Sequence, residues 1–349
     1  MINNFFKGNT LAGKTTILQA GIVSLILISL TVFSAYYTKN LVSQKVQKQL
    51  SQRLHQIHDT LDVYDSLLKT TANDLFQTFK SQFGEIELLP QYTEIVNGVE
   101  TPLITDVGVR LNNNNTYVDY YTKIEGATAT IFARKGDDFV RVATSLKRAD
   151  GTRVLGTFLG KKSPAYEPIM KGEKYFGTAS LFGNEYMAVY EPIVKEGKVI
   201  GILYVGYNYT KGYQKLKEKL KKLKVGETGY LYILSTNKKT KGDYVLHPTK
   251  EGENIFKDPH TADLDHINEI FNHKEGFIDY NWENPKTNSI EEKTVIYENY
   301  EDRDWKLILG TTKSEFLKES AKYTIIMAIL SFISVIAVVL AIVFSIRKL

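Results

Sequence analysis

The chain has 349 residues, no cysteine and a formal net charge of +5. Without cysteine, its domains must be stabilised by packing and not by disulfides. The charge is spread along the sequence, and the densest basic stretch is limited to residues 215–224, which argues against a nucleic-acid partner.

Two uncharged apolar runs lie near the ends of the chain, at residues 15–38 and 323–346. Each has 24 residues. As an α-helix, such a run measures about 36 Å at about 1.5 Å per residue and can cross a bilayer core of about 30 Å. The first run could also be a cleaved export signal, but the apolar core of a signal is usually about 7–15 residues long. We therefore expect two transmembrane helices that contact the lipid bilayer.

Basic residues flank both runs on the side of the chain ends. Lys7 and Lys14 precede the first run, and Arg347 and Lys348 follow the second. Because positively charged short flanks stay in the cytoplasm, residues 1–14 and 347–349 are expected to be cytoplasmic. The middle of the chain is then periplasmic or extracellular, and the protein lies in the inner (plasma) membrane with two spans. That middle is long enough for two domains.

Residues 39–82 continue from the first span as a predicted long helix. Its apolar positions recur every three or four residues, and glycine and proline are absent from residues 39–83. The apolar stripe could pack on the protein's own domain or form the seam of a homodimer. We expect both, with the membrane-near half free to dimerise.

Beyond Gly84 the pattern changes to short β-type runs separated by turn signals. The first set comprises residues 128–133, 139–144, 186–193 and 199–207, and the second set comprises residues 230–234, 244–247, 293–300 and 305–311. Residues 112–115 are expected to form a loop. A short lysine-rich helix within residues 211–224 connects the two sets.

The two sets of runs repeat each other. Residues 126–132 match residues 226–232, and Tyr190-Glu191 matches Tyr297-Glu298. Residues 201–206 likewise match residues 305–310. Chance similarity between strand-forming residues is the alternative, but the repeat predicts two copies of one α+β module.

These segments also resemble a known family. Residues 126–208 resemble the first half of the Cache_3-Cache_2 type of extracytoplasmic sensor domain, which is common in bacterial methyl-accepting chemotaxis receptors. VGETGYLYIL, Leu246-His247-Pro248, GFIDYNWENP and the hairpin of Trp305 resemble its second half. The resemblance covers residues 84–318. It implies two tandem PAS-like modules on a long amino-terminal helix, and small-molecule recognition between a sheet and its overlying loops.

On this basis the α+β middle divides into a membrane-distal Cache_3-like module at residues 83–210 and a membrane-proximal Cache_2-like module at residues 211–312. Residues 313–322 connect the second module to the second span. Relatives usually continue into a methylated cytoplasmic coiled coil. Because this sequence ends at Leu349, we expect either a longer chain or a cytoplasmic signalling partner.

The sequence gives no sign of enzyme chemistry. It has no cysteine nucleophile and no serine, histidine and aspartate pattern that can be placed together. The spacing of His260, His266 and His273 matches no closed ligand set for a metal. We therefore expect no catalytic residues, no metal and no cofactor.

In the first module, a candidate site lies on the strand that contains Arg141, Thr144 and Ser145. A guanidinium and hydroxyls there could converge on a carboxylate through charge-assisted hydrogen bonds. Related citrate and C4-dicarboxylate sensors have an arginine at the position of Arg141 and an aromatic residue at that of Tyr190, but Ala188 occupies the place of their second arginine. The ligand could therefore be a monocarboxylate, an amine or a neutral small metabolite. Alternatively, Arg141 could be a surface charge with no part in ligand binding.

In the second module, Tyr230, Tyr232, His247, Tyr280 and Trp282 could form an aromatic cup with a titratable donor. The alternative is that Tyr232, Trp282 and Trp305 are core residues of alternating strands.

The function expected is that of a chemoreceptor input region, in which a ligand closes a module and moves the strand at residues 305–311. That movement would displace the second span by about 1–2 Å. An input region of a sensor histidine kinase or diguanylate cyclase is an alternative, and so is a membrane-anchored binding protein that does not signal.

Overall fold

The computed structural model describes residues 11–258, 265–284 and 289–348, and it divides into two compact units. The terminal unit consists of Met1–His58 and Lys217–Leu349, and the central unit consists of Asp59–Leu216. Helix α1 (Leu11–Lys80) contributes residues to both units, and so does helix α4 (Thr210–Lys221). The predicted cytoplasmic start of the chain at residues 1–10, as well as His260, lies outside the described residues.

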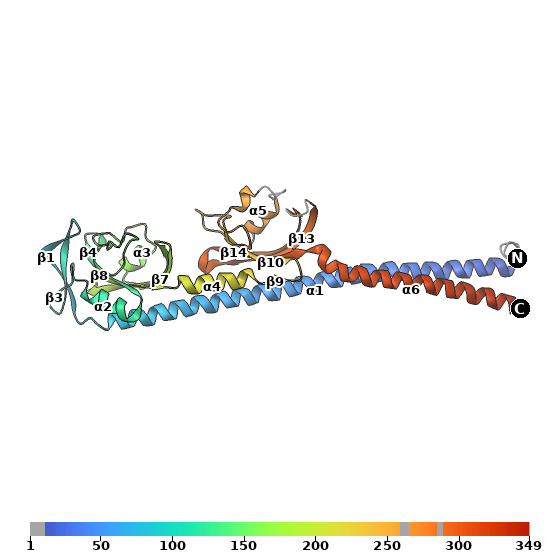
Figure 1. Ribbon diagram of the computed structural model, residues 1–349, viewed down its shortest axis with the longest axis horizontal. Helices are drawn as coiled ribbons and strands as arrows, with labels where there is room; N and C mark the ends of the chain where they lie inside the picture. Colours follow the sequence, from blue (N-terminus) through green and yellow to red (C-terminus); the bar gives the residue numbers. More distant parts are fainter. Residues whose placement is uncertain (1–10, 259–264, 285–288, 349) are drawn as a thin grey trace. The chain divides into compact units, whose positions relative to one another are not determined.

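Two helices of the terminal unit are long and apolar enough to cross a membrane: the first part of α1 and helix α6 (Lys313–Lys348). The apolar stretches of both are unburied within the chain, and the two helices overlap the predicted spans at residues 15–38 and 323–346. In Figure 1, α6 (red) runs beside the start of α1 (blue). Thr31 and Ser331 join them through their hydroxyls, which lie 2.7 Å apart.

The central unit contains a five-stranded antiparallel sheet in the order β5-β4-β8-β7-β6. The strands are β4 (Thr128–Lys135), β5 (Asp138–Thr144), β6 (Tyr175–Leu181), β7 (Asn184–Lys195) and β8 (Lys198–Asn208). Helices α2 (Thr116–Glu125) and α3 (Tyr166–Met170) belong to the same unit. A separate sheet of β1 (Ile86–Val96), β2 (Val99–Asp106) and β3 (Val109–Arg110) precedes it and was not predicted from the sequence.

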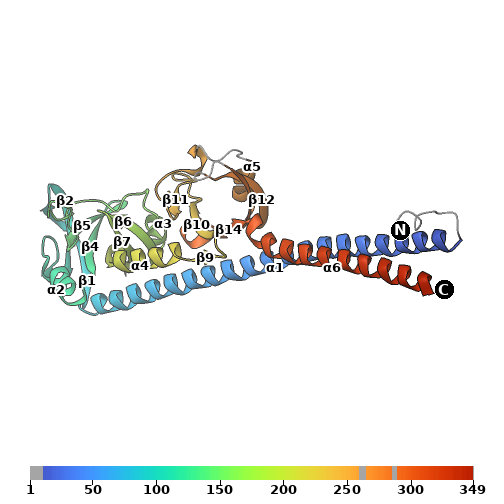
Figure 2. The same cartoon turned by 45° about the vertical axis from the view of Figure 1, so that its right-hand side comes forward.

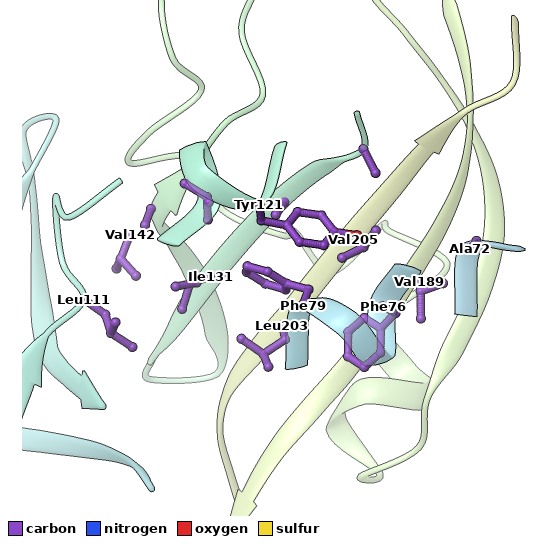
Figure 3. Close-up of a cluster of buried hydrophobic side chains, with 14 of the residues drawn as sticks. Ala72, Phe76, Phe79, Leu111, Tyr121, Ile131, Val142, Val189, Leu203 and Val205 are labelled. Atoms are coloured by element: carbon purple, nitrogen blue, oxygen red, sulfur yellow. The ribbon is translucent and has the colours of Figure 1, made fainter. Parts of the chain in front are cut away.

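The two faces of the central sheet have different cores. On one face, Phe76 and Phe79 of α1 pack with Leu203 and Val205 of β8, as Figure 3 shows, and Tyr121 of α2 lies next to Phe79. The other face carries a second cluster with α3, formed by Phe132, Phe139, Ala165, Ile169, Ala188, Val199, Ile202 and Tyr204.

The terminal unit contains a sheet with an equivalent strand order, β11-β10-β14-β13-β12, and β9 pairs with β10. Its strands are β9 (Lys224–Val225), β10 (Gly229–Ser235), β11 (Tyr244–Leu246), β12 (Glu275–Glu283), β13 (Ile290–Tyr300) and β14 (Trp305–Thr312). The 3-10 helices η1 (Ile255–Lys257) and η2 (Glu301–Arg303) and helix α5 (Asp265–Asn272) complete it. The shared order supports the predicted repeat of one α+β module.

Figures 1 and 2 show α1 and α5 on opposite sides of the terminal sheet. On α1, the side chains of Leu50, Leu54 and Ile57 are buried. The carboxylate of Glu298 on β13 lies close to two histidines of α1. Its oxygens are 3.1 Å from Nδ1 of His55 and 2.8 Å from Nδ1 of His58. This part of the predicted apolar stripe therefore packs within the chain, and the predicted homodimer stays a prediction.

Candidate ligand-binding site

A cavity of about 490 Å³ lies on the α5 side of the terminal sheet. It is bounded by β10 to β13, η1, α5 and the turn that follows β11. All five residues predicted for the second module line it, and they are Tyr230, Tyr232, His247, Tyr280 and Trp282. The structure therefore brings together, around one cavity, side chains that are up to about 50 residues apart in the sequence.

Aromatic rings form the wall of this cavity. Tyr230 and Tyr232 have the same parity on β10, so both face the cavity side of the sheet. The ring of His247 lies 5.3 Å from Tyr230 and 4.8 Å from Tyr244, between ring centroids. Burial raises the pKa of Tyr230 to about 12 and holds the pKa of Tyr232 well above its ordinary value. The phenols are therefore neutral at physiological pH. Tyr232 also belongs to the buried core of the unit, so the same side chain packs in the core and lines the cavity.

The imidazole of His247 is fixed by the turn that follows β11. Its Nδ1 accepts the backbone N–H groups of Thr249 and Lys250, at 3.1 and 3.0 Å. Burial, together with the positive charges of Lys250 and Lys293, lowers the pKa of His247 to about 4. The ring is therefore neutral near pH 7, and because Nδ1 accepts, its proton lies on Nε2, which makes Nε2 a donor.

On β12, Tyr280 stacks on the ring of His266 from α5, with ring centroids 4.0 Å apart and planes 7° from parallel. This contact fixes the tyrosine from the helix side of the cavity. Burial raises the pKa of Tyr280 well above its ordinary value, so this phenol too is neutral.

Lys293 of β13 is the residue that the sequence analysis missed. Its side chain lines the cavity, and the residue is 8% exposed. Its Nζ lies 3.4 Å from the centroid of the Trp282 ring and 3.3 Å from the hydroxyl of Tyr230. Burial lowers the pKa of Lys293 to about 8. Among the described residues, no carboxylate lies within ion-pair distance of this ammonium.

The sequence did hold a signal for Lys293. Val295 and Tyr297 are core residues of the same strand, and Lys293 lies two and four residues before them. Side chains two residues apart on a strand point to the same face of the sheet. A lysine on the buried face of a strand should therefore have been a candidate.

One edge of the cavity adjoins the start of α6. Thr228 and Thr312 line the cavity, and their hydroxyls lie 3.0 Å apart. Glu315, in the first turn of α6, accepts hydrogen bonds from Thr228. Burial raises the pKa of Glu315, but hydrogen bonds from Thr228 and from the Glu227 backbone outweigh it and hold that pKa below the ordinary value. Lys313 forms ion pairs with Asp279 of β12, at 2.9 Å, and Glu292 of β13, at 2.6 Å.

In the central unit, Arg141 lies beside Tyr190 and Tyr204. Its Nη1 donates to the Thr157 hydroxyl and, at 3.4 Å, to the Val154 carbonyl oxygen. Its Nε is buried and has no hydrogen-bond partner among the described residues. Burial lowers the pKa of Arg141, and the nearby tyrosines Tyr190 and Tyr204 oppose this effect. Arg141 and Tyr190, both candidate site residues from the sequence, therefore lie close together, and their role in binding a ligand stays a prediction.

The two hydroxyl residues predicted beside Arg141 are occupied elsewhere. The Thr144 hydroxyl lies 2.6 Å from that of Thr130, within the sheet. The Ser145 hydroxyl accepts from Thr122 of α2, at 2.6 Å, and from the Ala129 N–H, at 2.9 Å. Their convergence with Arg141 on a ligand stays a prediction.

Comparison with known proteins gives one family. The family model described as the Cache 3/Cache 2 fusion domain matches residues 36–325. No significant match was found among curated proteins.

Several solved structures are similar to this chain. The sensory domain of the Campylobacter jejuni chemoreceptor Tlp3 has 12% identity and a TM-score of 0.45, with 80% of this chain and 98% of that chain covered. The extracellular domain of the histidine kinase mmHK1S-Z2 has 12% identity and a TM-score of 0.43, with 79% and 99% covered. The ligand-binding domain of Mlp24 with asparagine has 12% identity and a TM-score of 0.43, with 81% and 99% covered. At these values the likeness gives no information about the site.

Proposed function

This chain belongs to the Cache 3/Cache 2 fusion domain family, and on that premise we propose that it is the sensory input region of a transmembrane chemoreceptor. The ligand is a small molecule that binds in the aromatic cavity of the terminal unit. The observation that carries this proposal is the cavity itself, which has about 490 Å³ and whose lining includes four tyrosines, one tryptophan, the neutral His247 and the buried Lys293. Ligand pockets of proteins have this size, and in them polar groups between aromatic walls fix the orientation of the ligand.

The proposed setting is the inner membrane. The first part of α1 and helix α6 are long and apolar enough to span it, and the basic flanks favour cytoplasmic ends with the sensory modules outside. A receptor of this kind would have to pass a signal across the bilayer through its helices.

The proposed route of the signal is the contact between the cavity edge and α6. Thr228 and Thr312 line the cavity. Lys313 joins α6 to β12 and β13, and Glu315 joins it to the turn between β9 and β10. A ligand shifts such an equilibrium only if it binds one arrangement more tightly than the other. Ligand contact with β12 and β13 would therefore bias the position of α6.

The test is thermal unfolding of the full chain in lipid nanodiscs against a library of small metabolites. Both tryptophans, Trp282 and Trp305, are in the terminal unit, so their emission reports on that unit. A ligand at about 100 times its Kd stabilises by about 2.7 kcal/mol, which raises the unfolding temperature by several degrees.

The matched variants are Tyr280→Leu, in the cavity, and Tyr92→Leu, on an exposed tyrosine of the central unit. We expect Tyr280→Leu to abolish the ligand-induced shift and Tyr92→Leu to retain it. A library in which no compound shifts the unfolding temperature, or a shift that survives Tyr280→Leu in full, would contradict the proposed function.

A further inference from the structure

We propose that the cavity of the terminal unit recognises a carboxylate, and that Lys293, together with Tyr230, is the group that binds it. This inference rests on the proposed function and names the chemical class of its ligand.

The ammonium of Lys293 is buried and, within the part of the chain that the structure describes, forms no ion pair with a carboxylate. An ammonium has three protons to donate, and among the described residues its one hydrogen-bond partner is the hydroxyl of Tyr230. The face of Trp282, 3.4 Å away, stabilises the cation but accepts no hydrogen bond of ordinary strength. Burying an unpaired charge is costly. A carboxylate in the cavity would supply the missing acceptor and the missing negative charge.

The acidic groups around the cavity argue against an amine as the ligand. Asp258 forms an ion pair with Lys250, and Glu291 accepts a hydrogen bond of 2.8 Å from the side-chain amide of Asn284. Glu227 is exposed at the rim. Among the described residues that line the cavity, the buried charge without a partner in direct contact is therefore the positive one of Lys293.

Two neutral donors support the same class of ligand. Because the Tyr230 hydroxyl accepts from Lys293, its own proton is available to a carboxylate bound beside it. His247 carries its proton on Nε2, since Nδ1 accepts two backbone N–H groups. Charge-assisted hydrogen bonds of an ammonium and a phenol to one carboxylate would fix that end of the ligand.

The rest of the cavity favours an apolar body on the ligand. Tyr232, Tyr280, Ile255 and Ile267 line it, and the volume of about 490 Å³ exceeds what the smallest acids need. A carboxylate with an aromatic or branched aliphatic body fits both ends of the site.

The test uses phenylacetate and isovalerate as probes, each beside its neutral amide and its amine analogue of similar shape. The full chain in nanodiscs carries Trp305→Phe, so that Trp282, in contact with Lys293, is the sole tryptophan. Titration of its emission at pH 7 gives Kd. We expect a carboxylate probe to bind at least about tenfold more tightly than its amide or amine, because hydrogen bonds to charged groups have that strength.

The key variant is Lys293→Met, with Lys293→Arg as the conservative change and Lys274→Met as the control on an exposed lysine. We expect Lys293→Met to weaken carboxylate binding about 10- to 100-fold, Lys293→Arg to retain part of it, and Lys274→Met to leave it unchanged.

A second measurement needs no variant. Because the pKa of Lys293 is about 8, the affinity of the unaltered site for a carboxylate should be constant from pH 6.5 to about 8 and then decline towards pH 9.5. Glu291, Lys250 and Asp258 also face the ammonium. The pKa of His247, about 4, and that of Tyr230, about 12, lie outside this window.

The outcomes separate this inference from the proposed function. Failure of both carboxylates to bind, or binding unaffected by Lys293→Met and by pH, overturns carboxylate recognition. If the amides or amines bind instead and Tyr280→Leu abolishes their binding, the sensory function stands and the ligand class is wrong. If no library compound binds, the proposed function itself fails.

Discussion

Glu315, in the first turn of α6, accepts hydrogen bonds from both the backbone N–H and the hydroxyl of Thr228, at 2.9 and 2.5 Å. Thr228 lines the cavity, so this carboxylate is one direct contact between the cavity edge and α6, beside the two ion pairs of Lys313. We predict that Glu315→Ala weakens the coupling between the cavity and α6 while ligand affinity stays within about threefold, which corresponds to less than 1 kcal/mol.

The measurement for this prediction is disulfide formation between Thr31→Cys and Ser331→Cys, whose native hydroxyls lie 2.7 Å apart. The chain has no cysteine of its own, so the engineered pair reports alone. A bound ligand should change the rate of disulfide formation in the parent and in Lys318→Ala, an exposed control. The same ligand-induced change in Glu315→Ala would rule out this carboxylate as the link.

Gly226 is predicted to be essential to the same contact. Its φ is +63°, and a Cβ added there would lie 1.8 Å from Oε1 of Glu315. Gly252, with a φ of +83° and no atom within 4 Å of an added Cβ, is the matched control. Gly226→Ala should destabilise the terminal unit by about 1–2 kcal/mol more than Gly252→Ala, because only the first substitution adds a clash to the backbone cost. Equal unfolding temperatures by tryptophan emission would show that Glu315 moves aside freely.

We predict that His247 makes the free energy of unfolding of the terminal unit depend on pH. Its pKa is about 4 in the folded state against an ordinary value of 6.5, so the unfolded chain takes up a proton first as the pH falls. The contribution of His247 is present above pH 6.5 and is lost as the pH falls through about 4, and it amounts to roughly 3 kcal/mol at most. In His247→Asn, the side-chain oxygen can still accept hydrogen bonds from the two N–H groups, but no imidazole remains to take up a proton. The part of the acid-induced loss of stability that is due to His247 should therefore be absent in this variant.

Thermal unfolding at several pH values checks that prediction. Because other groups can also contribute to the loss of stability at acidic pH, the quantity to compare is the difference in unfolding temperature between the parent and His247→Asn. A difference that does not change between pH 7 and pH 4 would show that His247 is not the titrating group.

Arg141→Ala is predicted to act on the central unit and not on the terminal cavity. The substitution removes the hydrogen bonds to Thr157 and Val154, which should cost about 1–3 kcal/mol and raise hydrogen exchange in residues 146–160. Carboxylate titrations followed by Trp282 emission should be unchanged. Loss of ligand binding without increased exchange would instead place the ligand at Arg141.

The sequence predicted most of the strands and the aromatic wall of the cavity, because both depend on alternation along single strands. Tyr230 and Tyr232 share a face of β10, and Tyr280 and Trp282 share a face of β12. Their meeting in one cavity depends on the strand order β11-β10-β14-β13-β12, which alternation along a single strand does not give.

Two parts of the structure could not be predicted in this way. Strand β5 has a register shift opposite Ile131 and Phe132 of β4. As a result, Arg141 pairs with Phe132 while Thr144 pairs with Thr130. Strict alternation along the strand therefore no longer predicts which side chains share a face. Strands β1 and β2 also contain a register shift, between Leu89 and Thr93, and their mixed polar and apolar residues give no clear period.

Strand β14 ends at Thr312 and helix α6 begins at Lys313, with no residue between them. Because no loop lies between them, the signal route proposed above would need no intervening segment: a twist of the final strand would pass directly to the first turn of the helix. Insertion of two glycines between Thr312 and Lys313 would place a flexible segment at this junction. The sheet and α6 would each keep their fold, but a movement of the sheet would no longer be transmitted to the helix.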